Sequence, residues 1–114
     1  MNRCVSSPLT CSGYGDREGY DRTDPKVRNA AHAQDARLRE TGALMGIAGA
    51  PVQVRNWDAK AIDTTAGPFM SSSLPIAGFA VIEAPTLEEA VRMVAQSPCA
   101  VAHGVVEVWP LNPS

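Results

Sequence analysis

The sequence predicts one α+β domain, with two helices lying on one face of an antiparallel sheet. Two amphipathic helix patterns begin at Asp24 and Thr86, and strand patterns lie between and after them. The 114 residues are enough for one domain with one modest core. Helices alternating with strand patterns in this way are typical of an α+β layer structure.

The first 23 residues are predicted to be an irregular segment. They are rich in Ser, Gly, Asp and Arg, and Pro8 lies within the one stretch that resembles a strand. Proline is excluded from the centre of a sheet because it donates no backbone hydrogen bond. We therefore place the folded domain at residues 24–114 and expect any first strand to be doubtful.

Both helices have clear start signals. Asp24 is an N-cap residue followed by Pro25 at the first helical position, and Gly42 is placed to end this helix. Thr86 and Glu89 have the spacing of a capping box. Four apolar residues of the second helix recur at helical spacing and predict one buried stripe: Leu87, Ala90, Val91 and Val94.

Three strand patterns follow the first helix and complete the predicted order of elements. Residues 51–65 predict a hairpin, residues 76–84 a central strand, and the run GVVEVWPL a last strand that ends at Pro110. With a doubtful first strand, this order predicts a ferredoxin-like βαββαβ sandwich. The last strand carries apolar residues on both faces, and two helices cover only one face. We therefore expect a homodimer in which a second copy covers the open face.

Composition narrows the class of protein. The net charge is -2 and the basic residues are scattered, which argues against a nucleic-acid partner. No apolar run reaches the length of a membrane span, and the N-terminus has no apolar leader, so neither a membrane nor secretion is expected. The three cysteines form no CxxC pair, which predicts free thiols in the cytoplasm. No metal or cofactor is expected, because the two histidines lack ligand spacing.

Several motifs together resemble one family. They are GPF in AIDTTAGPF, Gly78-Phe79, the LEEA helix, Ser97-Pro98, VVEVWPL and the earlier run VRNAAHAQDARLRETGALMG. Their order and spacing, over about residues 25–111, resemble the YCII-related domains of the Asp-Gly-Pro-Phe branch. The resemblance implies a dimeric α+β barrel of two ferredoxin-like subunits packed sheet to sheet. It also implies a pocket between sheet and helices, with small-molecule acid–base chemistry in some members.

The chain departs from the family pattern at three places. Ala66 stands where the motif has Asp. Some members pair a His on the first helix with an acidic residue before a proline near the end of the second helix. His32 matches that His, but Ser97 stands at the acidic position, which makes Ser97 a binding candidate and breaks the pair. The family's hydrophobic first strand is replaced by MNRCVSSPLTC.

His32 is the candidate catalytic residue. Histidine is the residue type most often used as a general base, and His32 is suited to that role on a small carbonyl or phenolic compound. Asp35, three residues later on the same helix, is placed to orient the ring. The alternative is a solvated helix face that carries Arg28, His32, Asp35 and Arg39.

Two further residues are candidate binding residues. Arg55 is suited to bind an acidic ligand through paired hydrogen bonds, or it is an outward residue of the hairpin. His103, just before the last strand, either joins a pocket rim or is merely exposed.

Two functions remain open. The first is a YCII-related protein that binds a small aromatic or carboxylate compound and is an isomerase- or lyase-type catalyst through His32. The alternative is a non-catalytic dimerisation or regulatory module that has lost the acid–base pair. A pocket lined by both His32 and Arg55 would favour the first, since a module needs only the dimer face.

Overall fold

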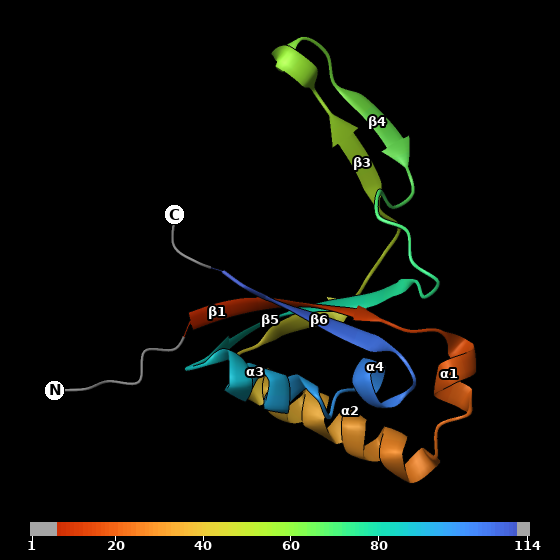
Figure 1. Cartoon of the computed structure of the whole chain (residues 1–114), viewed down its shortest axis with the longest axis vertical. Helices are drawn as coiled ribbons and strands as arrows, with labels where there is room; N and C mark the ends of the chain where they lie inside the picture. The colour runs from red at the N-terminus through yellow and green to blue at the C-terminus, as the bar shows by residue number, and fades with distance from the viewer. Residues whose placement is uncertain (1–6, 112–114) are drawn as a thin grey trace, which may run out of the picture.

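The chain folds into a four-stranded antiparallel sheet with helices on one face, and a separate two-stranded sheet (Figure 1). The computed structural model describes residues 7–111. The main sheet has the order β2-β5-β1-β6. Its strands are β2 (Leu44–Ile47), β5 (Ile76–Ala84), β1 (Ser7–Tyr14) and β6 (Val105–Pro110).

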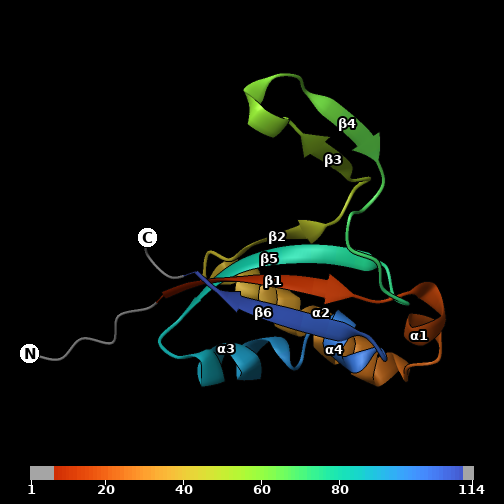
Figure 2. The same cartoon turned by 45° about the horizontal axis from the view of Figure 1, so that its top comes forward.

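The helices lie together below the main sheet (Figure 2). The two longer ones are α2 (Pro25–Glu40) and α3 (Leu87–Val94), and the short α4 (Pro98–Val101) follows α3. The five-residue α1 (Arg17–Asp21) lies at one end of the sheet, between β1 and α2. The main sheet thus has one covered face and one open face.

The prediction of an irregular segment over residues 1–23 is wrong for the part that the structure describes. Residues 7–14 form β1, which pairs antiparallel with both β5 and β6, and residues 17–21 form α1. Leu9 and Cys11 alternate onto the covered face and are buried there, so the strand has an apolar side despite its polar composition. Residues 1–6 of the predicted segment, including Cys4, lie outside the described residues.

Pro8 is accommodated because it lies where β6 has ended. The last pair between the two strands is Leu9 with Pro110, and the Pro8 carbonyl accepts a hydrogen bond from the Leu111 N–H at 3.0 Å. In a strand, the N–H and C=O of one residue point the same way. The missing N–H of Pro8 therefore faces the end of β6, and β5 loses no hydrogen bond.

The predicted helix starts are confirmed. The Asp24 side chain accepts a hydrogen bond from the Lys26 N–H at 2.8 Å, and Thr86 Oγ1 accepts one from the Glu89 N–H at 3.1 Å. Each satisfies an N–H that has no partner within its helix. The return half of the capping box is not formed, because the Glu89 carboxylate bonds Arg92 instead.

The predicted hairpin is confirmed, but it is not part of the main sheet. β3 (Val52–Arg55) and β4 (Asp63–Ala66) pair antiparallel around a 3-10 turn, η1 (Trp57–Ala59). The hairpin stands away from the main sheet on the side opposite the helices (Figure 1). The edge strands of the main sheet are β6 and β2, and the sequence analysis did not predict β2.

The core lies between the covered sheet face and α3. Its buried side chains are Leu9, Cys11, Ile82, Ala84, Ala90 and Val94. The predicted stripe of α3 is only half buried, since Leu87 is 51% exposed and Val91 48% exposed. This helix has only eight residues, and Ala90 and Val94 are its buried positions.

Candidate functional site

A pocket of about 740 Å³ lies between the covered face of the sheet and the helices. Its floor comes from β1 and β5, and its walls come from α1, α2 and the segment Ser97–Cys99. The volume falls in the range that holds small organic ligands.

Two glycines on neighbouring strands form part of the pocket floor. Gly13 and Gly78 are register partners on β1 and β5, and both line the pocket. A Cβ added at Gly13 would lie 2.8 Å from Cys99 Sγ, and one at Gly78 would lie 2.6 Å from the Gly46 carbonyl oxygen. Cys99 already occupies the space over Gly13, and the backbone of β2 occupies the space over Gly78, so neither position has room for a larger side chain.

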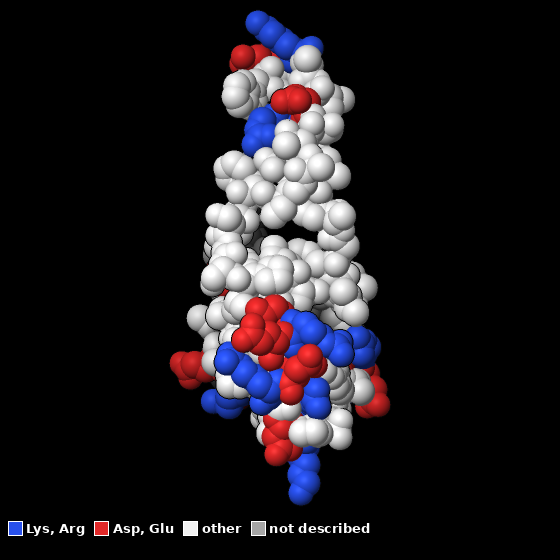
Figure 3. All heavy atoms as spheres, turned by 90° about the vertical axis from the view of Figure 1, so that its right-hand side faces the viewer, with Lys and Arg blue, Asp and Glu red and all other residues white. Residues whose placement is uncertain are grey.

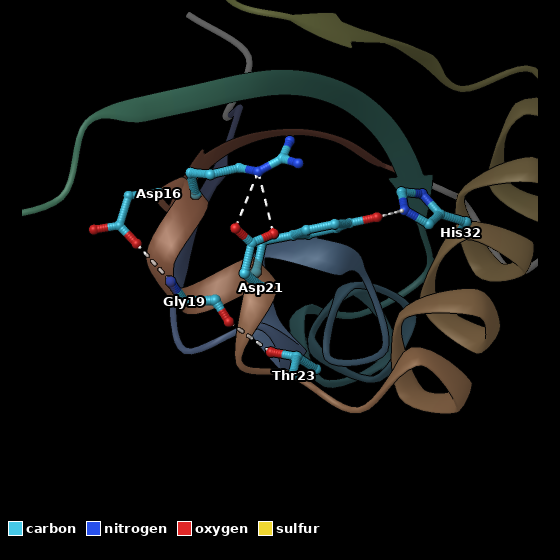
Figure 4. A network of polar contacts seen from close by, with 7 residues as sticks. Asp16, Gly19, Asp21, Thr23 and His32 are labelled. Carbon is cyan, nitrogen blue, oxygen red and sulfur yellow. Dashed lines mark hydrogen bonds and ion pairs between the residues drawn. The ribbon is translucent and has the colours of Figure 1, made fainter.

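One wall carries a hydrogen-bonded pair of side chains from two helices. The Tyr20 hydroxyl lies 2.8 Å from His32 Nε2, with the ring centroids 5.9 Å apart (Figure 4). Both residues line the pocket. The Arg28 guanidinium lies 4.8 Å from the centroid of the Tyr20 ring, in a cation–π contact.

The helix that supplies Tyr20 is anchored by several polar contacts (Figure 4). The Asp16 side chain accepts a hydrogen bond from the Gly19 N–H at 2.9 Å. The buried Thr23 hydroxyl donates to the Gly19 carbonyl at 2.7 Å. Gly19 packs directly on the turn after α4, because an added Cβ would lie 2.6 Å from the Ala102 carbonyl oxygen. These contacts fix where α1 presents Tyr20.

Asp35 lines the same pocket, one helical turn after His32. Its Oδ1 is buried and has no hydrogen-bond partner within the described residues. Burial raises the pKa of the Asp35 carboxyl, while the nearby charges of Arg39 and His32 act to lower it.

Cys99 is also in the pocket, beside Gly13. Burial raises the pKa of the Cys99 thiol, and the negative charge of Asp35 raises it further. The thiol therefore stays protonated at neutral pH, which argues against a role as nucleophile.

The structure brings two of the four predicted site residues together. His32 and Ser97 both line the pocket. Arg55 lies on the hairpin, where it donates to Gln53 Oε1 at 2.8 Å and lies over the Phe69 ring. His103 is exposed in the turn after α4, with a φ of 62°, and is not part of the pocket lining. His32 and Arg55 thus do not share a pocket.

The sequence analysis missed Tyr20 because this residue lies within residues 1–23, which were predicted to be irregular. The local signal for α1 is Asp16, a residue type common at helix N-caps. In the structure its side chain accepts a hydrogen bond from the Gly19 N–H, three residues later. The contact of Tyr20 with His32 spans twelve residues and depends on the packing of α1, which the local pattern does not encode.

Comparison of the chain with protein-family models and with curated proteins finds no match. Among residues 7–111, no helix has both the length and the apolar character needed to cross a membrane. In the same part of the chain, no three His, Cys, Asp or Glu side chains are grouped so as to hold a metal ion. The pocket is therefore the feature of the described residues that bears most directly on function.

Proposed function

We propose that the protein binds a small aromatic or carboxylate compound in the pocket between its sheet and its helices and exchanges a proton with it through His32. The observation that carries the proposal is the Tyr20–His32 hydrogen bond at the wall of a 740 Å³ pocket. Arg39 lines the same pocket and supplies a positive charge suited to a carboxylate.

The reaction class that fits these groups is isomerisation or elimination. The neutral imidazole takes the proton at Nε2, through the Tyr20 hydroxyl bonded there. The hydroxyl passes its own proton to Nε2 and takes one from a carbon next to a carbonyl group, and the electron pair moves toward the carbonyl oxygen. Return of the proton to another carbon gives an isomer, and departure of a leaving group gives a lyase product. Histidine suits both steps because its pKa lies near neutral pH.

We further propose that the main sheet is a ferredoxin-like βαββαβ core of the YCII-related type. The strand order β2-β5-β1-β6 supports this, as do the two helical connections on one face. Ser97 lines the pocket that contains His32, which supports its equivalence to the family's acidic position. Cys11 and Cys99 are free thiols, which supports a reducing, cytoplasmic location.

The open face of the sheet supports a homodimer. Exposed apolar side chains lie on this face and on the hairpin: Leu44, Phe79, Val81, Val105 and Trp109 on the sheet, and Val52, Val54, Trp57, Ile62, Phe69 and Met70 on or beside the hairpin. Figure 3 shows that charged groups gather at the helical end and the hairpin tip, with an uncharged band between them. A second copy of the chain would cover this band.

The same observation favours a second candidate function, a non-catalytic dimerisation or regulatory module. Ala66 and Ser97, which replace the family's carboxylates, also favour it. The two candidates differ in whether the pocket takes a ligand.

A thermal-shift screen with small aromatic and carboxylate compounds, benzoate and catechol among them, separates the two candidates. The proteins are the wild type, His32→Ala, and His103→Ala as control for loss of a histidine outside the pocket. Binding at about 100 times Kd adds about 2.7 kcal/mol of apparent stability. We expect at least one compound to stabilise the wild type and His103→Ala but not His32→Ala. If no compound does so, the dimerisation module is the better account.

A further inference from the structure

We propose that Tyr20 orients His32 and sets its tautomer: its hydroxyl donates to Nε2 and so keeps the proton of the neutral imidazole on Nδ1. A role of this hydrogen bond in proton exchange rests on the proposed function. The tautomer of His32, in contrast, can be measured in the protein without any ligand. The 2.8 Å distance from Tyr20 Oη to His32 Nε2 is that of a well-formed hydrogen bond.

The direction of this bond follows from the chemistry of the two groups. A neutral imidazole has one N–H and one nitrogen lone pair, and the lone pair is a better acceptor than a phenol oxygen. A phenol O–H is in turn a better donor than the N–H of a neutral imidazole. The Arg28 guanidinium over the Tyr20 ring draws electron density from the ring and further favours donation by the hydroxyl. Both effects place the lone pair, not the proton, on Nε2.

The surrounding structure holds Tyr20 in place for this role. Thr23 and Asp16 each bond the backbone of Gly19, the residue before Tyr20. Gly19 in turn packs against the Ala102 carbonyl with no room for a side chain. A hydroxyl so fixed at Nε2 orients the ring of His32, which is otherwise exposed on α2.

A tyrosine is suited to this position in both protonation states of the histidine. When the imidazole is neutral, the hydroxyl donates to Nε2. When the imidazole is protonated, Nε2–H donates to the hydroxyl oxygen, so the bond persists with its direction reversed. Ser97 lines the same pocket but bonds the Val94 carbonyl through its hydroxyl at 2.6 Å, so it does not serve this purpose. Tyr20 thus gives His32 an orienting partner from a different helix.

Nitrogen NMR of the imidazoles tests the proposal without any ligand. The chain has only two histidines, so His32 and His103 give two separable sets of signals. At a pH where the imidazole is neutral, we expect His32 of the wild type to be mainly the Nδ1–H tautomer. Tyr20→Phe keeps the ring and its contact with Arg28 but removes the hydroxyl. It should shift His32 toward the Nε2–H tautomer, which free histidine prefers.

Tyr14→Phe is the matched control, since Tyr14 is the other tyrosine of the chain and does not line the pocket. It should leave the His32 tautomer unchanged. A wild-type His32 that is mainly Nε2–H would overturn the proposal, even if Tyr20→Phe failed to fold. So would a Tyr20→Phe protein that folds and keeps the wild-type tautomer. A missing ligand in the thermal-shift screen would count against the proposed function and leave this result unaffected.

Discussion

Asp35 is the residue in the pocket whose environment most opposes its charge. Burial raises the pKa of its carboxyl, and its buried Oδ1 has no hydrogen-bond partner within residues 7–111. The folded state therefore keeps the Asp35 proton at pH values where the unfolded chain has lost it. This group costs stability at neutral pH, and the cost disappears as the pH falls below the ordinary value of 3.8.

Asp35→Asn is accordingly expected to increase the free energy of unfolding near neutral pH. The gain should be below about 1 kcal/mol, because the side chain is still partly solvated. It should shrink toward zero in acid, where the wild-type carboxyl is neutral too. Urea unfolding from acid to neutral pH measures the difference, with the exposed Asp63→Asn on the hairpin as control. A difference that stays constant with pH, or has the opposite sign, would contradict this account of Asp35.

At the residue scale, His32 was singled out because it matches the His of the YCII-related pattern on the first long helix, and in the structure it lines a pocket. Arg55 has the same chemical suitability for an acidic ligand but lies on the hairpin. Alternating apolar and polar residues predict that the hairpin forms. They do not predict where it lies relative to the sheet, because that depends on contacts between residues distant in sequence.

At the scale of elements, only one half of the predicted capping box forms at the start of α3. Thr86 Oγ1 accepts from the Glu89 N–H, but the Glu89 carboxylate bonds Arg92. Thr86→Ala should therefore cost about 1 kcal/mol of stability, as loss of an N-cap usually does. Glu89→Ala should cost about 0.5 kcal/mol or less, because it removes only an exposed ion pair.

Equilibrium unfolding of the two variants in urea measures these costs. Equal losses would mean that the carboxylate contributes to the cap after all. A Thr86→Ala protein as stable as the wild type would mean that the cap does not stabilise α3.

The elements that sequence reasoning predicted are those defined by local chemistry. Asp24-Pro25 and Thr86 specify helix starts through their own side chains, and both starts are confirmed. β1 was not predicted, because Pro8 is tolerated only through the early end of β6, a tertiary fact. β2 was not predicted, because four residues that include Gly46 give too short a pattern.

For the whole molecule, the open sheet face is the feature that most needs a partner. Trp109 is 53% exposed on the open face of the edge strand β6, and Leu87 on α3 is 51% exposed on the helical side. The two residues are matched in exposure but lie on different sides of the sheet. A glutamate at each position therefore separates two effects: loss of a dimer that forms through the open sheet face, and the general effect of adding a charge to an exposed apolar site.

Trp109→Glu is expected to weaken the proposed homodimer by about 10-fold or more in Kd, because it replaces a large exposed aromatic side chain of the proposed interface with a charge. Leu87→Glu should leave the dimer unchanged. Sedimentation velocity over a range of concentrations measures both. A wild type that remains monomeric at high concentration would contradict the sheet-to-sheet dimer, as would equal effects of the two variants.

The central claim is that the pocket beside His32 takes a small molecule. The most direct measurement follows the carbon-bound protons of the two imidazoles by NMR while the aromatic and carboxylate panel is titrated into the wild-type protein. The account predicts that at least one compound moves the His32 signals and leaves those of His103 in place. Binders that move only His103 would contradict it, as would a panel in which no compound moves His32 at millimolar concentration.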